Sequence, residues 1–564
     1  MGDARDDVAS DERADLMPTR RVILAALSAA GVGSMVFQRA LAAQAEATSG
    51  VTAEMIQQAE WIAGLNLSDE DRKATAAAVQ GAVARFSELR KASVDYGDPP
   101  ALLFNPTPGT LSDGEIRRGA VPIDFDKPLT KPDSADELAY LPVSELSRLL
   151  RTKQVSSMEL TNLYLERLHR HNEKLLCVVT FLDDLARKQA AQADEEIRAG
   201  KYRGPLHGIP WGAKDLIAYP GYKTTWGAVP FQEQVLDHKA TVAQRLDDAG
   251  AVLVAKLSLG ALAWGDQWFG GMTRNPWKLE QGSSGSSAGS AAATAAGLVG
   301  FTLGSETLGS IVSPCRRCGT TGLRPTFGRV SRYGCMPLAW SMDKIGPICR
   351  SVEDCAIVFD AIHGADGKDP TAVSRPFHWP APRDWKTMRV GYIRDEKQPD
   401  EERQELKVLR ELGVQLIPIQ LPDSFPLQAL SIILTAEAST VFDELTRTNR
   451  LEGTGLWPNS LRQGQFIPVI EYLRANRIRW RMMQEMEQVM KGVDAYVGGD
   501  DLMITNLTGH PTVVLPQGME TRDGVERPKM LTMTGQLYGE ADLLALADAF
   551  QKTAGDAHRR RPAI

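Results

Sequence analysis

The stretch Gly282-Ser-Ser-Gly-Ser-Ser-Ala-Gly-Ser290 and the later Gly304-Ser-Glu-Thr-Leu-Gly-Ser310 are two glycine-rich turns that carry serines and decide the fold of this chain. Between them lie a small-residue segment, residues 291–297, and an uncharged, strand-like run, residues 298–303. Clusters of glycine and serine are usually flexible linkers. A helix of small side chains must pack closely, however, and an uncharged strand is typical of a buried parallel sheet. We therefore expect a site where the two turns bring serine hydroxyls together.

Each turn also matches a better-known motif but lacks a feature that the motif requires. Residues 304–309 have the glycine spacing of a phosphate loop, but Ser310 stands where that loop requires lysine. Successive backbone N–H groups there would instead form a nest for an oxyanion. Residues 285–289 match Gly-x-Ser-x-Gly, the nucleophile elbow, with Ser287 at its centre. That elbow requires a preceding strand, and residues 275–281 are not expected to form one.

Four further segments carry a resemblance to a known family. They are Leu206-His-Gly-Ile-Pro-Trp-Gly-Ala-Lys-Asp215, Gly322-Leu-Arg-Pro-Thr-Phe-Gly-Arg-Val-Ser331, Asp343-Lys-Ile-Gly-Pro347 and Asn506-Leu-Thr-Gly-His-Pro-Thr-Val-Val-Leu-Pro516. Together with the two turns, they resemble the motifs of the amidase signature family, in the same order, over roughly residues 137–550. The resemblance implies an α/β fold with a mostly parallel, mixed central sheet that helices cover on both sides. It also implies a hydrolase that needs no metal and no cofactor.

The same resemblance implies the catalytic roles. Matched motif by motif, Ser310 is the nucleophile, Ser286 is the bridging serine and Lys214 is the base. A serine hydroxyl is a poor nucleophile until a base takes its proton. Lysine can act as that base only when it is neutral, and because its ordinary pKa is about 10.4 it must be buried among neutral partners. Ser286 would then relay the proton and return it to the leaving amine.

The resemblance also places an oxyanion hole on the backbone N–H groups just before the nucleophile, those of Thr307, Leu308 and Gly309. Loss of one such donor typically costs about a hundredfold or more in rate. Three residues nearby depart from the family pattern, since Glu306 replaces Asp, Leu308 replaces Gly and Val312 replaces Arg. A leucine at position 308 would be strained if that position needed a positive φ.

The first 45 residues are expected to be an export signal and not part of the fold. Thr19-Arg-Arg-Val-Ile-Leu24 precedes a mild apolar run to Phe37, and Ala40-Leu-Ala42 and Ala43-Gln-Ala45 offer small-residue cleavage sites. The apolar run, about 16 residues, is short for a membrane span. The order of these parts predicts twin-arginine export. The mature protein would then be periplasmic or secreted and not stably inserted in a membrane, and a cytoplasmic protein is the alternative.

The rest of the chain divides into an appendage and a main domain. Residues 46–136 are expected to hold a helical appendage, with a helix cap at Ser68, and an irregular wrap. Residues 137–555 alternate helical and strand patterns, as an α/β domain does. The resemblance assigns the catalytic core to residues of about 205–350 and 495–545, and a variable substrate region to about 420–490.

Aromatic residues and cysteines offer weaker signals. Trp264, Trp268 and Phe269 are candidates for the lining of a substrate pocket, although buried core explains them as well. Six cysteines in 564 residues do not form a disulfide scaffold. Cys315-x-x-Cys318 lacks the second half of a zinc site. We expect free thiols there, and an oxidised pair stays open.

The sequence thus predicts an amidase that cleaves a carboxamide C–N bond, outside the peptide backbone, through an acyl-enzyme on Ser310. A net charge of −7 argues against a nucleic-acid partner. The resemblance implies a small-molecule amide as the partner, and a homodimer stays open. One alternative is the A-type subunit of a transamidosome, which would need cytoplasmic partners. Another is a Ser-His-Asp esterase with His363, His378 or His510, and a third is a catalytically silent relative that only binds.

Overall fold

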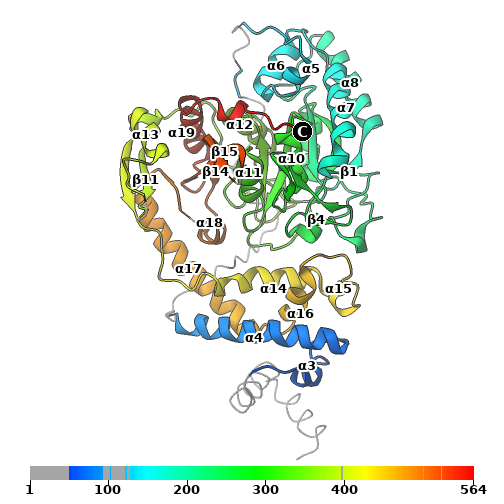
Figure 1. Ribbon diagram of the computed structural model, residues 1–564, viewed down its shortest axis with the longest axis vertical. Helices are drawn as coiled ribbons and strands as arrows, with labels where there is room; N and C mark the ends of the chain where they lie inside the picture. The colour runs from blue at the N-terminus through cyan, green and yellow to red at the C-terminus, as the bar shows by residue number, and fades with distance from the viewer. Residues whose placement is uncertain are drawn as a thin grey trace, which may run out of the picture.

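The computed structural model describes residues 50–92, 102, 121–123, 128–395, 398–499, 501–522 and 524–564. The expected export signal, residues 1–45, and most of the expected wrap lie outside these residues. Within them, one large mixed sheet forms the centre of the molecule and helices flank it on both faces (Figure 1). The predicted α/β class is thereby confirmed.

The central sheet has eleven strands in the order β1-β3-β2-β8-β10-β9-β14-β15-β13-β11-β12. Two groups of three strands are parallel: β3 (Val252–Leu257), β2 (Pro210–Lys214) and β8 (Phe301–Glu306), and β13 (Ala495–Val497), β11 (Arg389–Ile393) and β12 (Gln415–Ile419). All other neighbouring pairs are antiparallel, so the sheet is less parallel than the sequence predicts. The remaining strands are β1 (Val178–Phe181), β9 (Thr321–Arg324), β10 (Lys344–Cys349), β14 (Thr512–Arg522) and β15 (Val525–Gly535).

Helices bury both faces of this sheet. The side chains of Phe301 and Leu303 point into the larger core, which α12 (Val352–Ile362) and α19 (Glu540–Thr553) cover. Thr302, between them, faces α10 (Ala288–Ala295), which packs beside α11 (Val312–Cys318) on the opposite side. The flanking helices are α5 (Ala135–Ala139), α6 (Val143–Arg151), α7 (Ser157–Leu175), α8 (Asp183–Arg198), α9 (Thr241–Asp248), α13 (Gln404–Glu411) and α18 (Leu502–Thr508).

The segment between the two serine turns folds as a helix and a strand, but the helix begins earlier and the strand later than predicted. α10 begins at Ala288, inside the glycine-rich stretch, and β8 begins at Phe301 instead of residue 298. Residues before the first turn do form strands, contrary to expectation. β6 (Arg274–Asn275) and β7 (Lys278–Gly282) make a two-stranded hairpin outside the central sheet, as do β4 (Gln267–Trp268) and β5 (Gly271–Met272).

A separate layer of helices lies below the sheet in Figure 1. Its members are α3 (Ala53–Ala59), α4 (Asp69–Lys91), α14 (Ile432–Val441), α15 (Asp443–Arg447), α16 (Trp457–Gly464) and α17 (Val469–Lys491). The predicted cap is present, because the Ser68 side chain accepts from Asp71 N at 3.1 Å. Phe86 of α4 packs among buried methionines of α17, such as Met482 and Met486. The appendage therefore packs on the predicted variable region.

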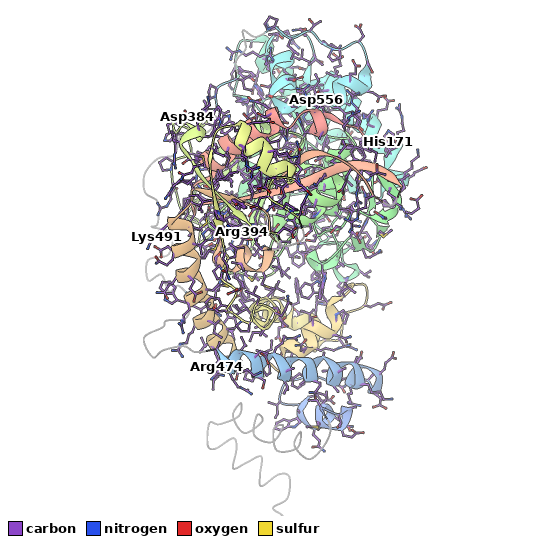
Figure 2. All side chains as sticks on the ribbon, turned by 60° about the vertical axis from the view of Figure 1, so that its left-hand side comes forward. His171, Asp384, Arg394, Arg474, Lys491 and Asp556 are labelled. Atoms are coloured by element: carbon purple, nitrogen blue, oxygen red, sulfur yellow. The ribbon has the colours of Figure 1, made fainter. Side chains whose placement is uncertain are left out.

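The longest helix of this layer joins it to the sheet. Figure 2 shows Arg474 and Lys491 at opposite ends of α17, with Arg474 beside α4 and Lys491 near the sheet. Glu471 near its start accepts from Arg90 Nε of α4 at 2.9 Å. None of the described helices is both long and apolar enough to cross a membrane.

Candidate active site

Lys214 is the last residue of β2, and its side chain ends among three serine hydroxyls. Its Nζ donates to Ser286 Oγ at 2.8 Å, to Ser287 Oγ at 3.0 Å and to Ser305 Oγ at 2.9 Å. Lys214 is fully buried and Ser286 is 1% exposed. The structure therefore brings together the lysine and the serine that the sequence pairs as base and relay.

Strand geometry keeps carboxylates away from this amine. Successive side chains of a strand point to opposite faces, so Asp215 points away from Lys214 and pairs with Lys256 Nζ at 2.8 Å. Burial lowers the pKa of Lys214 to about 7, although the more distant charges of Asp343 and Glu306 raise it. A large share of the amine is therefore neutral near neutral pH, as a base must be.

The turn that carries Ser286 is packed tightly against its surroundings. The peptide bond between Gly285 and Ser286 is cis. Ser284 N donates to Asp266 Oδ2 at 2.9 Å, which holds the turn from outside. A Cβ at Gly285 would lie 1.8 Å from the backbone oxygen of Gly265, so only glycine fits there.

Ser310 lies in the second turn, between β8 and α11. Ser287 N donates to Ser310 O at 3.1 Å, and this bond joins the two turns. Ser310 is 9% exposed and is therefore largely buried in this turn. The expected nucleophile thus lies beside the segment that holds the expected relay.

A buried carboxylate shapes the second turn. Glu306 Oε2 accepts from Ile311 N at 2.8 Å and from Val312 N at 2.9 Å, while its Oε1 accepts from Arg324 Nη1 at 2.7 Å and Asn506 Nδ2 at 2.8 Å. Burial would raise the pKa of Glu306, but nearby positive charges, Arg324 first, outweigh it and hold the pKa at about 2. Glu306 therefore stays ionised and holds the backbone that directly follows the nucleophile.

The expected oxyanion loop follows directly after Glu306. The Thr307 hydroxyl donates to Asp343 Oδ1 at 2.6 Å, and burial raises the pKa of Asp343. Gly309 has a φ of +84°, and a Cβ there would lie 2.9 Å from a neighbouring serine oxygen. Leu308 is not among the described residues with positive φ. The strain that a leucine would suffer is thus avoided, because glycine occupies the left-handed position.

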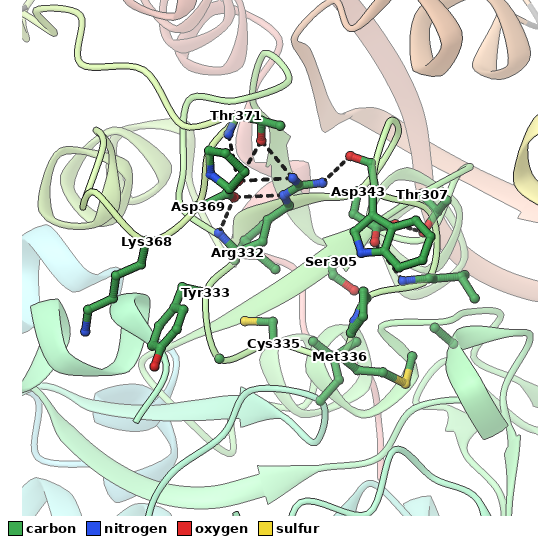
Figure 3. A pocket seen from close by; sticks show the side chains of 18 residues that line it. Ser305, Thr307, Arg332, Tyr333, Cys335, Met336, Asp343, Lys368, Asp369 and Thr371 are labelled. Carbon is green, nitrogen blue, oxygen red and sulfur yellow. Dashed lines mark hydrogen bonds and ion pairs between the residues drawn. The ribbon is translucent and has the colours of Figure 1, made fainter. Parts of the chain in front are cut away.

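A cavity of about 400 Å³ lies beside this loop. Ser305 and Thr307 line it next to the candidate catalytic groups, and Met336 and Trp340 are part of its mostly apolar wall. Figure 3 shows Arg332 at one side of the cavity. Arg332 is fixed there by Asp369, whose carboxylate accepts from its Nε at 2.9 Å.

The three aromatic residues predicted to line a substrate pocket do not line this cavity. Trp264 is 41% exposed and packs edge-on against Trp457, with ring centroids 4.8 Å apart. Trp268 packs against Phe269 at 4.9 Å. None of the three lines the cavity beside Ser305 and Thr307. The loop before β10 supplies that wall instead, because it crosses the open end of β8.

The histidines of the esterase alternative do not approach the nucleophile. His510 is buried, its Nδ1 lies 2.8 Å from Thr508 Oγ1, and burial lowers its pKa to about 3. His363 is buried in a stack with Phe359, and His378 is exposed. Over the residues that the structure describes, Ser310 has no hydrogen bond to a histidine.

The cysteines are all free, including Cys315 and Cys318 on α11. Cys315 packs in a small apolar cluster with Val312 and Ile348 beneath the second turn. No group of three or more His, Cys, Asp or Glu side chains in the described ranges could hold a metal ion.

Three polar residues of the site received no catalytic role from the sequence analysis. Ser287 and Ser305 both accept from Lys214, and Asp343 receives the Thr307 hydroxyl. Ser305 gives a usable signal, since it is a polar residue near the end of a mostly buried strand. Asp343 gives none by itself, because only the fold brings β10 beside β8.

Comparisons with known proteins agree with this geometry. A family profile described as Amidase matches residues 159–499. The A-type subunit of glutamyl-tRNA(Gln) amidotransferase from Roseiflexus castenholzii is 34% identical over 490 residues, 76% of this chain and 98% of that protein. Its counterpart from Moorella thermoacetica is 32% identical over 489 residues, 76% of this chain and 99% of that protein.

Solved structures give the same assignment. The native peptide amidase from Stenotrophomonas maltophilia superposes with a TM-score of 0.65 at 29% identity, covering 75% of this chain and 98% of that one. A peptide amidase in complex with the competitive inhibitor chymostatin gives 0.66 at 29% identity, covering 75% and 99%. The chain therefore belongs to the amidase signature family of enzymes.

Proposed function

We propose that this chain hydrolyses a linear carboxamide through an acyl-enzyme on Ser310. Lys214, as a neutral amine, accepts a proton from Ser286, which accepts the proton of Ser310. The Ser310 oxygen then forms a bond to the carbonyl carbon, and the carbonyl oxygen becomes an oxyanion. The backbone N–H groups of Thr307, Leu308 and Gly309 would stabilise that charge.

The second half of the reaction returns the proton. When the oxyanion collapses, the C–N bond breaks and the leaving amine takes the proton from Lys214 by way of Ser286. Water then attacks the Ser310 ester, with Lys214 again as base, and releases the carboxylic acid. Each group ends in its starting state, so no cofactor has to supply or accept electrons.

The observation that carries this proposal is the environment of the lysine amine. Its 2.8 Å hydrogen bond to Ser286 and its burial, with a pKa of about 7, suit a base that works near neutral pH. A cationic surface lysine could not take a proton from a serine relay.

A covalent probe tests the proposal. A fluorophosphonate should label wild-type protein at Ser310, and Ser310→Ala should abolish labelling. Lys214→Ala should lower the rate of labelling and of amide hydrolysis by about a hundredfold or more, as loss of a base does. His510→Ala is the matched control and should leave both rates within about threefold. Full activity of Lys214→Ala together with an inactive His510→Ala would replace this proposal with the esterase mechanism.

The named relatives offer a second candidate, an amidotransferase component. The observation in its favour is the 34% identity to a protein so named. Such a component would pass the amide nitrogen to an acceptor held by a partner. Hydrolysis of small amides by the purified chain, at a rate that no partner raises, would favour the free-standing amidase.

We also propose that the chain is exported by the twin-arginine pathway. The support is the order of Arg20 and Arg21, the apolar run and the small-residue sites in the sequence. Free cysteines are compatible with it, because a protein without disulfides can fold before it crosses a membrane.

A further inference from the structure

A buried arginine of the helical layer joins α17 to two segments that approach the second turn. Arg479 is 6% exposed and lies where α17 passes beside α18 (Figure 1). Its guanidinium donates from Nε to Leu507 O at 2.6 Å, from Nη1 to Ser341 Oγ at 2.8 Å and from Nη2 to Ser341 O at 2.7 Å. A buried guanidinium is costly unless its donors have partners, so these bonds tie both segments to the helix.

The first segment is the wall loop, residues 336–342, which contributes to the wall of the cavity beside the candidate catalytic groups. Ser341 belongs to this loop, and Asp343 follows it directly. Asp343 Oδ2 accepts from two backbone N–H groups of the loop, at 2.8 and 3.0 Å. Its Oδ1 accepts from the Thr307 hydroxyl at 2.6 Å. One carboxylate thus joins the wall loop to the expected oxyanion loop, just before Ser310.

The second segment is α18, which contains Leu507. The preceding residue, Asn506, donates from Nδ2 to Glu306 Oε1 at 2.8 Å. Glu306 Oε2 in turn accepts from the two backbone N–H groups that follow Ser310, at 2.8 and 2.9 Å. The path from Arg479 through α18 therefore reaches the backbone on the other side of the nucleophile.

A carboxylate of the same helical layer strengthens the contact with the wall loop. Glu437 of α14 accepts from Ser341 N at 2.9 Å and from Ser341 Oγ at 2.7 Å, and it also accepts from Tyr472 OH of α17 at 3.0 Å. Arg479 and Glu437 are both buried, where hydrogen bonds to charged groups are stronger than in water. Two helices of the layer therefore set the position of Ser341.

We propose that Arg479 is a positioning residue for the reaction at Ser310, because it anchors the second turn to the helical layer from both sides of the nucleophile. It acts through Asp343 on one side and through Glu306 on the other. The inference rests on the proposed amidase function, and it gives a part in catalysis to a region that the sequence analysis assigns only to the substrate. A displacement of about 1 Å in such a site can cost on the order of a hundredfold in rate.

Hydrogen exchange tests the anchor without turnover. Arg479→Met keeps much of the apolar stem and removes the donors. We expect backbone amides of residues 304–312 to exchange about threefold faster or more, while exchange in β2, which carries Lys214, stays as in wild type. Arg474→Met is the matched control on the same helix, since Arg474 is 30% exposed and pairs with Glu471, and it should leave both segments unchanged. Unchanged exchange in a folded Arg479→Met protein would overturn the proposal.

Kinetics test whether the anchor serves catalysis. Arg479→Met should lower kcat for amide hydrolysis at least about tenfold and raise KM severalfold, and Arg479→Lys should recover part of both. A partly unfolded sample would lower the apparent kcat and leave KM unchanged, so the combined change separates positioning from instability. Arg474→Met should keep both constants within about twofold. A folded Arg479→Met protein with wild-type kcat and KM would contradict the proposal.

A milder variant covers the case in which Arg479→Met does not fold. Ser341→Ala removes one acceptor of Arg479 and one donor to Glu437 and keeps the backbone contacts. It should raise KM severalfold and speed exchange of residues 304–312, with kcat changed less than about twofold. Wild-type KM and exchange in Ser341→Ala would likewise refute the anchor. Absence of hydrolysis by the wild type, together with faster exchange in Arg479→Met or Ser341→Ala, would refute only the amidase function.

Discussion

The state of one amine decides whether this site can act. Lys214 Nζ lies within hydrogen-bond distance of three serine hydroxyls and has no ion-pair partner among the described residues, because the neighbouring carboxylate of Asp215 is turned toward Lys256. A substitution that placed a charged side chain beside Lys214 would shift its pKa and so change the fraction of neutral amine. The direction in which the end of β2 points Asp215 therefore helps to keep Lys214 able to act as a base.

This state predicts a pH dependence. Burial lowers the pKa of Lys214 to about 7, and only the neutral amine can take a proton. The kcat/KM for an amide should therefore rise as the pH passes upward through about 7 and then level off. Lys214→Arg should be inactive throughout, since arginine keeps its proton below a pH of about 12. An activity that is flat from about pH 5 to about pH 9 would contradict the role of this lysine.

Sequence reasoning reached some residues of the site and not others. Lys214 and Ser286 were accessible because both stand in recognisable motifs, and the structure brings them within 2.8 Å. Trp264 does not line the cavity beside Ser305, because the position of an aromatic residue near a motif does not say which way its side chain points. Trp340, which does line the cavity, lies in a loop whose position depends on the pairing of β10 with β8. Pairing between strands that are distant in the sequence leaves no pattern in the residues around Trp340, so its place in the cavity could not be predicted.

The first serine turn depends on a close approach between two loops. Gly285→Ala would place a methyl group 1.8 Å from the Gly265 backbone oxygen, and backbone cannot move aside cheaply. We expect the variant to lose several kcal/mol of stability, on the order of 3 kcal/mol, and nearly all activity. Gly518→Ala is the control, because a Cβ there meets nothing within 4 Å. Thermal unfolding and amide hydrolysis measure both effects, and a fully stable, active Gly285→Ala would show that the turn can rearrange.

Elements with strong local signals were predictable, and their pairing was not. The predicted cap at Ser68 is observed at the start of α4, and the strand predicted for residues 298–303 is observed, three residues later, as β8. The hairpin of β6 and β7 was missed because its strands are short and interrupted by Pro276. The share of antiparallel pairs was also missed, since an uncharged strand can be buried in either orientation.

The molecule as a whole combines a catalytic sheet with a helical layer that packs on it through α17. The appended α4 buries Phe86 against methionines of α17, and Arg462 of α16 pairs with Asp71 of α4 at 2.6 Å. The helical layer is thus held together by contacts of α4 with α16 and α17, which lie far from α4 in the sequence. Phe86→Ala should weaken the packing of α4 on α17 and leave the catalytic side chains in place. The variant therefore separates the packing role of α4 from the catalytic reaction.

The cellular localisation of the protein is the remaining property that the sequence predicts. Arg20 and Arg21 stand before an apolar run, in the order that a twin-arginine signal has. Replacing both arginines by lysine keeps the charge and the hydropathy of the segment. We expect the doubly substituted full chain to stay in the cytoplasm, as measured by cell fractionation, while Arg559→Lys with Arg560→Lys is exported normally. Export of the Arg20→Lys, Arg21→Lys chain at the wild-type level would assign the segment another role.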